Sequence, residues 1–316
     1  MENEIFLAII FAVSLLAVFA YKKINGKKKF CTGIDINKAE KKEIPESAGI
    51  ALLVPFFIAI IFLQFTGTAQ NLFPFAALAT IFALVGFFDD KKHKFKSKPV
   101  PWLARATPIA AASLVYAAMF SPNIFWIIPL ALFVAGTASL QNTFAGLNGW
   151  EVGSGLIISI FVSFILTGSP YFLAAVSLSA MMLALLWFNA FPAKVFPGDS
   201  GTLFIGSAIS GLMVLTKDAG LIALSFLFFL PHMVDFFLLK LTTNRADPTQ
   251  QKIRPYKLLQ NNQLAIPDYP EKKTRYDFAK LLIKMFGPMK EQKIVLIIWA
   301  VVIANGLIWL AVFGKI

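Results

Sequence analysis

Long apolar runs separated by short polar loops form the main pattern of this chain. A bilayer core about 30 Å thick is crossed by roughly 20 apolar residues in a helix, or by fewer where flanking side chains reach the interface. Ten runs meet this requirement, four of them short. They lie at Ile5–Tyr21, Ala48–Thr66, Leu72–Phe88, Thr107–Phe120, Ile124–Leu140, Gly155–Leu166, Tyr171–Ala190, Thr202–Leu215, Leu221–Leu239 and Ile294–Phe313. The pattern predicts an all-α, polytopic membrane protein with about ten transmembrane helices.

Composition supports this fold class. Of 316 residues, 58% are hydrophobic and 15% are charged, whereas soluble domains are about half apolar and a quarter charged. A water-soluble enzyme is therefore excluded, and one membrane domain over residues 1–316 is expected. Cys31 is the single cysteine, so neither an intrachain disulfide nor a two-cysteine zinc site can form. The acidic start Met1–Glu4 lacks the basic flank of a secretory signal, so the first helix is expected to remain as an anchor.

Basic residues fall almost entirely in alternate loops. The loops after the first, third, seventh and ninth runs hold 27 Lys and Arg, and the other side holds only Lys217 and Lys315. Since basic loops stay in the cytoplasm, both termini are expected outside and the long loops in the cytosol. The net charge of +12 is thus explained by topology, and nucleic acid is not an expected partner.

The last cytosolic loop, 240–293, is too long for a bare connection. Apolar residues recur in it near helical spacing, at Tyr276, Phe278, Ala279, Leu282, Ile283 and Phe286. This spacing predicts an amphipathic helix on the membrane surface that ends at Gly287 and Pro288. The alternative is an ordinary cover over the cytosolic face of the protein.

Three polar clusters occur at cytosolic helix ends, where carboxylates are costly and often mark sites. The first is Asp89 and Asp90, followed by a lysine-rich loop. Neighbouring helical residues point about 100° apart, so the two carboxylates are not expected to hold one ion in the same way. One carboxylate would face a metal and the other would orient a lysine or a substrate. A solvated helix end is the alternative.

The second cluster runs from Asn142 to Glu151, and the third from Asn189 to Gly201. Asn142, Asn148 and Glu151 offer hard oxygen ligands, and the glycines between them let a ligand approach the backbone. Asp199 follows a Pro-Gly pair at a helix start, where it could also be a simple N-cap. Together the three clusters describe a cytosolic pocket with oxygen ligands and many lysines, as a magnesium-bound diphosphate requires.

The same clusters carry a resemblance to a known family. Nearly the whole chain resembles the polyprenyl-phosphate N-acetylhexosamine-1-phosphate transferases of glycosyltransferase family 4. The motifs that carry the resemblance are residues 45–49, Phe88 to Asp90, 142–151 and 196–199. The loop 145–151 looks most like the eukaryotic and archaeal branch. The resemblance implies transfer of GlcNAc-1-phosphate from UDP-GlcNAc to a dolichyl or other polyprenyl phosphate, the first step of lipid-linked oligosaccharide assembly for N-glycosylation.

The resemblance also implies roles for single residues. Asn142 and Asp199 match the ligands of Mg²⁺, for which Mn²⁺ could substitute. Asp89 and Asp90 match an essential pair near the acceptor phosphate, and Lys98 aligns with a lysine on the diphosphate. The matches to substrate-binding positions are Glu46, Gly146, Asn148, Glu151, Phe196 and Arg245, with Arg254 as a rival for the last.

Departures from the family pattern narrow the substrate. Bacterial cell-wall members have a histidine cluster in the last cytosolic loop, but His93 and His232 both lie elsewhere, which argues against a muramyl-pentapeptide donor. Ser139 stands where the eukaryotic-like branch often has a second asparagine. Another UDP-HexNAc or an undecaprenyl-phosphate acceptor stays open, as does a ten-helix transporter, which would place its polar residues near the bilayer midplane.

Location and assembly follow from the same resemblance. An archaeal member would lie in the plasma membrane and a eukaryotic member in the endoplasmic reticulum membrane, with the catalytic face cytosolic. The family suggests a homodimer. Asp235, inside the ninth run near His232 and Lys240, is a further functional candidate, and a structural pair or a snorkelled group is the alternative.

Overall fold

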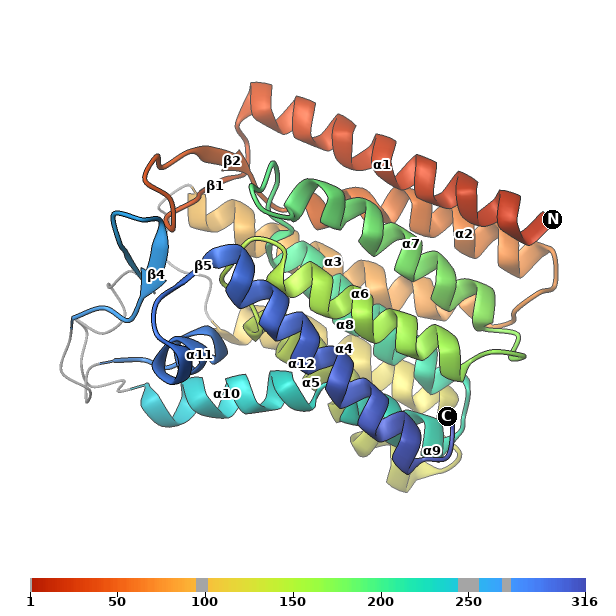
Figure 1. Cartoon of the computed structure of the whole chain (residues 1–316). Coiled ribbons are helices and arrows are strands. Elements are labelled where there is room, and N and C mark those ends of the chain that lie inside the picture. Colours follow the sequence, from red (N-terminus) through yellow and green to blue (C-terminus); the bar gives the residue numbers. More distant parts are fainter. Residues whose placement is uncertain (1, 95–101, 244–255, 269–273) are drawn as a thin grey trace.

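The computed structural model describes residues 2–94, 102–243, 256–268 and 274–316 (Figure 1). The chain is a bundle of long helices with short strands at one end. The helices are α1 (Glu2–Lys28), η1 (Ala48–Leu52), α2 (Leu53–Phe65), α3 (Leu72–Lys94), α4 (Trp102–Phe120), η2 (Ile124–Trp126), α5 (Ile127–Thr143), α6 (Trp150–Ile165), α7 (Phe172–Asn189), α8 (Gly198–Leu215), α9 (Ala219–Leu227), α10 (Leu230–Thr242), α11 (Phe278–Phe286) and α12 (Glu291–Val312).

All ten predicted apolar runs are helical, which confirms the all-α, polytopic fold class. Among the described residues, eight spans are long and apolar enough to cross a membrane, and α9 with α10 adds a ninth that is bent by 54°. The remaining run, Gly155–Leu166, lies in α6, which has only 16 residues. The chain is an integral membrane protein.

One expected helix is broken. The run Leu221–Leu239 forms α9 and α10 instead of one continuous helix. Pro231 lies in the first turn of α10, and a proline ring clashes with the carbonyl four residues earlier, which here belongs to Leu227, the last residue of α9. The break therefore follows directly from the proline.

The central helix of the bundle is α8. Every residue from Ser200 to Leu215 is buried, and α8 packs against α3, α5, α6, α7 and α9. Its sequence is rich in Gly, Ser and Ala, and small residues let neighbouring backbones approach closely inside a membrane bundle. The helix starts at the polar end of the molecule, so its first turn can carry functional groups held by several neighbours.

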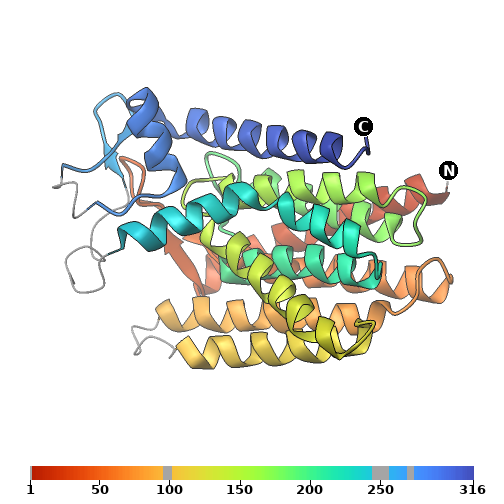
Figure 2. The same cartoon turned by 90° about the horizontal axis from the view of Figure 1, so that it is seen from below.

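The polar elements gather at the end of the bundle opposite the two termini (Figures 1 and 2). There β1 (Thr32–Ile34) pairs with β2 (Glu43–Pro45), and β4 (Gln263–Ala265) lies between β3 (Lys257–Leu258) and β5 (Met289–Lys290). All these pairs are antiparallel, with Gly33 opposite Ile44 and Leu264 opposite Met289.

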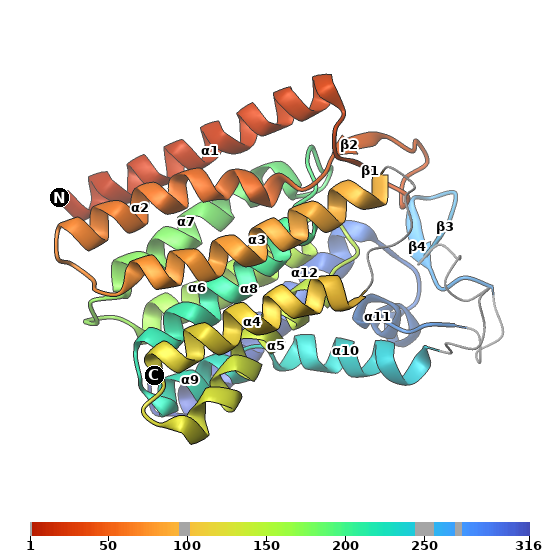
Figure 3. The same cartoon turned by 180° about the vertical axis from the view of Figure 1, so that it is seen from behind.

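The predicted amphipathic helix is confirmed as α11, which is capped by the Asp277 side chain and stops at Gly287. Its apolar side chains Phe278, Leu282 and Ile283 are buried, because α11 packs against α10, α12 and β4 at the polar end (Figure 3). Phe278, Leu282 and Ile283 are thus covered by protein, whereas Phe286 at the end of the helix is 63% exposed. The arrangement is that of a cover over this end of the bundle.

Candidate active site

The first turn of α8 is held by α3. Gly86 lies so close to α8 that a Cβ there would be 2.3 Å from the carbonyl carbon of Asp199. This approach brings Asp90 to the start of α8, where its carboxylate accepts backbone N–H groups from Asp199 at 3.0 Å and Ser200 at 3.3 Å. The Ser47 hydroxyl also donates to Asp90, at 2.6 Å. Asp90 therefore satisfies backbone donors that a helix start leaves unpaired.

Asp89 faces a different partner. Its carboxylate, 3% exposed, is ion-paired with Arg105 of α4. The same Arg105 nitrogen lies 3.2 Å from the Asp199 carboxylate. Arg105 thus bridges two acidic groups, as a guanidinium with several donors can. The two neighbouring aspartates act through separate contacts, one with an arginine and one with a helix start.

Asp199 is also held from α5. Asn142 Nδ2 donates to Asp199 Oδ1 at 2.9 Å and to the Thr202 hydroxyl at 2.8 Å. The two amide atoms of an asparagine are interchangeable by a half-turn, so Asn142 can present oxygen to the same position. Asp199 and Asn142 are therefore suitably placed to act on one bound cation.

A divalent cation fits this donor set. Mg²⁺ in phosphate-transfer sites takes one or two carboxylates, with the remaining positions filled by water and substrate phosphate. Asp199 retains 29% side-chain exposure, so its carboxylate is accessible to a ligand. The described residues contain no cluster of three His, Cys, Asp or Glu around a common metal position. A cation here would be shared with a phosphorylated substrate and not enclosed by protein.

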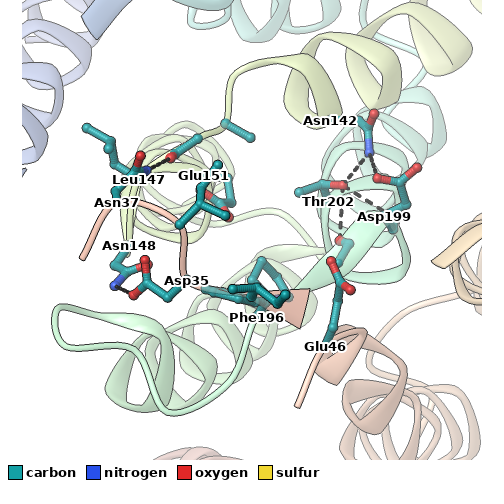
Figure 4. Close-up of a pocket in the computed structure, with 16 residues that line it drawn as sticks. Asp35, Asn37, Glu46, Asn142, Leu147, Asn148, Glu151, Phe196, Asp199 and Thr202 are labelled. Atoms are coloured by element: carbon teal, nitrogen blue, oxygen red, sulfur yellow. Dashed lines mark hydrogen bonds between the residues drawn. The ribbon is translucent and has the colours of Figure 1, made fainter. Parts of the chain in front are cut away.

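A pocket of about 230 Å³ opens beside Asp199. It is lined by residues from the β1–β2 connection, the α5–α6 loop and the start of α8. Figure 4 shows Asn142, Thr202 and Asp199 on one side, Asn148 and Asp35 on the opposite side, and Phe196 between them. The pocket therefore joins a cluster of oxygen ligands to an aromatic ring and a set of amides.

The α5–α6 loop is fixed by contacts with two other segments. Asn148 donates from its side chain to Asp35 at 3.0 Å and from its backbone N–H to Glu291 at 2.8 Å. Lys38 is ion-paired with Glu291 and lies 3.6 Å from Asp35. Asp35, Lys38, Asn148 and Glu291 thus form a closed polar ring. This ring joins the β1–β2 connection to the start of α12 and holds one wall of the pocket.

The opposite wall depends on pairing between two loops. The backbone N–H of Phe196 donates to Pro45 at 2.8 Å, and Ala48 donates to the carbonyl of Phe196 at 2.9 Å. The Tyr21 hydroxyl donates to the Glu46 carbonyl at 2.5 Å. These bonds place the Phe196 ring and the Glu46 side chain on the pocket lining.

Two buried oxygens beside the pocket have no hydrogen-bond partner among the residues that the structure describes. They are Asn37 Oδ1 and Glu151 Oε2, and both residues line the pocket. Asn37 Nδ2 is used, because it donates to the Gly146 carbonyl at 3.2 Å. Unpaired buried polar atoms are costly in a native structure, so a ligand or water is expected to satisfy these two.

The structure brings most of the predicted site residues together. Seven line the pocket: Glu46, Asn142, Gly146, Asn148, Glu151, Phe196 and Asp199. Asp89 and Asp90 lie next to it through the contacts with Arg105 and with α8. Lys98, Arg245 and its rival Arg254 lie outside the described residues, so their predicted roles stay predictions.

Sequence reasoning missed several residues of this site: Asp35, Asn37, Lys38, Arg105, Thr202 and Glu291. In the sequence, Arg105 contributes only to the basic charge that sets the topology, although a lone arginine at the start of an apolar helix is itself a signal of a site. Asp35 and Glu291 gave no such signal. Their positions depend on how two distant loops fold against the α5–α6 loop.

Asp235 belongs to a separate cluster. It is fully buried, and its Oδ1 accepts the backbone N–H of Phe278 at 2.6 Å. Nearby, the Tyr256 hydroxyl donates to Asp277 at 3.0 Å. Burial raises the pKa of the Asp277 carboxyl, and burial likewise lowers the pKa of Lys280 one turn along α11. These contacts anchor α11 to α10, so Asp235 has a structural partner in the start of α11.

Comparisons with known proteins identify the class. A sequence model of glycosyl transferase family 4 matches residues 72–217. A Methanocaldococcus jannaschii protein named as a glycosyltransferase is 32% identical over 308 residues, covering 96% of this chain and 93% of the relative. The chain therefore belongs to glycosyl transferase family 4. It is a membrane-embedded phospho-sugar transferase.

Two further relatives indicate the branch. A Saccharolobus solfataricus protein named as a UDP-N-acetylglucosamine–dolichyl-phosphate N-acetylglucosaminephosphotransferase is 31% identical, covering 87% of this chain and 86% of the relative. A Prochlorococcus marinus phospho-N-acetylmuramoyl-pentapeptide-transferase is 27% identical, covering 69% of this chain and 70% of its own length. The archaeal similarity extends over more of the chain, in agreement with the resemblance of the α5–α6 loop.

Proposed function

We propose that this protein transfers GlcNAc-1-phosphate from UDP-GlcNAc to a polyprenyl phosphate of the dolichyl type and releases UMP. The product is GlcNAc diphosphoryl lipid, the first intermediate of lipid-linked oligosaccharide assembly for N-glycosylation. The names of archaeal relatives from Saccharolobus solfataricus and Sulfolobus acidocaldarius describe transfer of GlcNAc phosphate from UDP-GlcNAc to dolichyl phosphate. The proposed location is the plasma membrane of an archaeon, or the endoplasmic reticulum membrane of a eukaryote, with the pocket facing the cytosol.

The observation that carries the proposal is the layout of the pocket. Phe196 and Asn148 provide an aromatic face and an amide for a uracil ring, and Asp199 and Asn142 lie on the other side, where a diphosphate would extend. Substrate pockets combine apolar or aromatic surfaces with a few fixed polar groups. A nucleoside diphosphate-sugar has this same combination of a flat base and a charged diphosphate.

The reaction exchanges one phosphoanhydride bond for another. An oxygen of the lipid phosphate attacks the sugar-linked phosphorus of UDP-GlcNAc, and the bond from that phosphorus to the bridging oxygen breaks. The electron pair stays on the bridging oxygen, and UMP leaves. A lipid phosphate is largely ionised at pH 7, so neither Asp89 nor Asp90 is required as a base.

The residues of the chain act mainly by placing charge. Two anions must meet, so a bound Mg²⁺, held by Asp199 and Asn142 and replaceable by Mn²⁺, would supply charge neutralisation at the diphosphate. Arg105 adds a positive charge beside Asp199, where it can bind the acceptor phosphate. Asp90 fixes the first turn of α8, and Asp89 holds Arg105. Lys98 and Arg245 are proposed to contribute further positive charge.

Two other functions compete with this proposal. The same transfer could use another UDP-HexNAc or an undecaprenyl-phosphate acceptor. A transporter has one supporting feature, the broken α9–α10 span. However, the pocket lies at the polar end of the bundle and not between the broken helices, and the chain is a family 4 member. Transfer is therefore the better-supported function.

Sugar choice is tested with purified protein in detergent. UMP release is measured with UDP-GlcNAc, UDP-GalNAc or UDP-MurNAc-pentapeptide as donor, each with dolichyl or undecaprenyl phosphate. UDP-GlcNAc with dolichyl phosphate is expected to give the highest kcat/KM, by about tenfold or more, because a site built for one set of hydroxyl groups rejects others. A higher kcat/KM with the muramyl donor would contradict the GlcNAc assignment but keep the family reaction.

A further inference from the structure

A second cavity lies at the far end of the bundle, on the side of the two termini. It has a volume of about 600 Å³ and an almost wholly apolar lining from α5, α9, the end of α4 and the end of α8. Leu132, which lines it, is 67% exposed, so the cavity opens sideways to the surroundings of the bundle. We call it the outer pocket. It has no part in the proposed transfer, and the inference below does not rest on that function.

The outer pocket is closed toward the active-site end. Phe133 of α5 and Phe226 of α9 both line it, and their rings meet edge to face with centroids 6.1 Å apart. Phe226 lies near the end of α9, roughly 10 Å along the helix axis from Ala219 at its start. The ring pair thus forms an inner floor, and the cavity has a depth of about two thirds of one leaflet of the bilayer core, not of a whole span.

One cationic side chain borders this apolar space. Lys217 lines the outer pocket, and it is held in a left-handed backbone conformation with φ of 55°. In the described part of the chain no carboxylate lies within ion-pair distance of its ammonium group. The neighbouring Asp218 is turned to α9, where it caps the helix by accepting the Leu221 N–H at 3.0 Å. Among the described residues, the charge of Lys217 is therefore not neutralised by a carboxylate.

The surroundings of the mouth are typical of a membrane interface. Trp126 lines the pocket and is 43% exposed, and the adjacent Phe125 is 86% exposed. Aromatic side chains concentrate at the level of lipid headgroups. An apolar cavity with a lysine at this level suits a lipid whose chain enters the protein and whose headgroup remains at the surface.

We propose that the outer pocket binds an anionic membrane phospholipid from the leaflet opposite the active site, with a hydrocarbon chain between α5 and α9 and the headgroup phosphate on Lys217. The positive charge of Lys217 favours a lipid with an anionic headgroup. Lys217 at the mouth favours a headgroup in this leaflet over the tail of the acceptor lipid, because that tail carries no charge along its length. The bound lipid would link α9 to α5 beside the 54° bend between α9 and α10.

The test measures lipid binding directly. The full chain is purified in a neutral detergent, stripped of lipid and titrated in native mass spectrometry with phosphatidylglycerol or phosphatidylcholine of the same acyl chains. We expect phosphatidylglycerol to bind about fivefold more tightly than phosphatidylcholine, as one lysine near the membrane surface allows. Lys217→Ala should abolish this preference. Lys315→Ala, at the same end of the bundle but away from the pocket, is the matched control and should keep it.

A second variant tests the cavity itself. Ala223→Trp places an indole in the outer pocket and should weaken binding of both lipids, whereas Lys217→Ala should affect only the anionic one. Size-exclusion profiles and thermal unfolding temperatures verify that each variant is folded. Equal wild-type affinities for the two lipids, an equal loss in Lys315→Ala, or unchanged binding in folded Ala223→Trp would each overturn the proposal. If dolichyl phosphate displaces phosphatidylglycerol, and its own binding is weakened by Ala223→Trp, the pocket would be assigned to the tail of the acceptor lipid instead.

Discussion

Gly86 of α3 and Asp199 of α8 touch backbone to backbone, and a Cβ at Gly86 would lie 2.3 Å from the Asp199 carbonyl carbon. This contact lets two helices from different parts of the chain cross at the site. It also places the Asp90 carboxylate within hydrogen-bond distance of the first backbone N–H groups of α8. The position of the candidate metal ligand therefore depends on the absence of a side chain one turn before the acidic pair.

Gly86→Ala is expected to separate α3 from α8 and move Asp199. Overpacking of this kind costs about 1–3 kcal/mol, so both the thermal unfolding temperature and UMP release should fall. The matched control is Gly136→Ala in α5, where an added Cβ would meet nothing within 4 Å. Differential scanning fluorimetry with an activity assay checks both variants. Equal behaviour of the two would show that the close crossing is not required.

Arg105 is expected to act on the acceptor phosphate. Arg105→Ala leaves Asp89 buried without this partner and removes one positive charge beside Asp199, so kcat should fall by about 10²-fold, as for the loss of one donor to a developing charge. Arg105→Lys keeps the charge but cannot bridge two carboxylates in the same way, and should recover part of the rate. Steady-state kinetics with varied lipid phosphate tests this. Unchanged kcat in Arg105→Ala would exclude the role.

Glu291 is expected to influence donor binding without taking part in the chemistry. Glu291→Ala removes the acceptor of the Asn148 N–H and the partner of Lys38. A hydrogen bond to a charged group contributes about 1.5–3 kcal/mol, so KM for the UDP-sugar should rise about tenfold or more with kcat nearly unchanged. The neighbouring exposed Gln292 provides the control as Gln292→Ala. An equal fall in kcat with unchanged KM would contradict this positioning role.

The buried carboxyl group of Asp277, at the start of α11, should make the stability of the protein depend on pH. Burial raises the pKa of the Asp277 carboxyl above its ordinary value of about 3.9, so the folded state holds a proton that the unfolded state releases. This contribution to stability is present below the ordinary value and is lost as pH rises through the raised pKa. Asp277→Asn, which can still cap a helix, should flatten this fall.

The measurement is the unfolding temperature of both proteins in small steps from pH 4 to pH 7. The unfolding temperature of Asp277→Asn should rise relative to that of the wild type as pH increases across this window. Parallel curves would mean that Asp277 ionisation does not contribute to the pH dependence.

Much of the fold was predictable because membrane helices can be recognised in a sequence by their length and hydrophobicity. All ten apolar runs are helices, and the proline that breaks the ninth run was visible in the sequence. What could not be predicted was the direction of the polar side chains. Asp90 binds the start of α8 only because Gly86 permits the crossing, and no local pattern around Asp90 encodes that contact.

The site was predictable to the extent that its chemistry lies in short motifs. Asn142 and Asp199 could be paired because their residue types match a diphosphate-bound cation and because the chain resembles a known family. The ring of Asp35, Lys38, Asn148 and Glu291 could not be predicted, since Asp35 and Glu291 are brought together by the packing of the first and last long polar loops on one short segment. Long-range loop contacts of this kind leave no periodic signal.

The central claim is most directly tested by UMP release from UDP-GlcNAc and dolichyl phosphate, with and without Mg²⁺, for the wild type and Asp199→Ala. The account predicts release that requires both lipid and Mg²⁺, is restored by Mg²⁺ after chelation with EDTA, and is lost in a folded Asp199→Ala protein. Turnover that persists in Asp199→Ala, or that is unaffected by EDTA, would contradict the proposed metal site. Absence of turnover with any UDP-sugar in folded wild-type protein would contradict the transferase account.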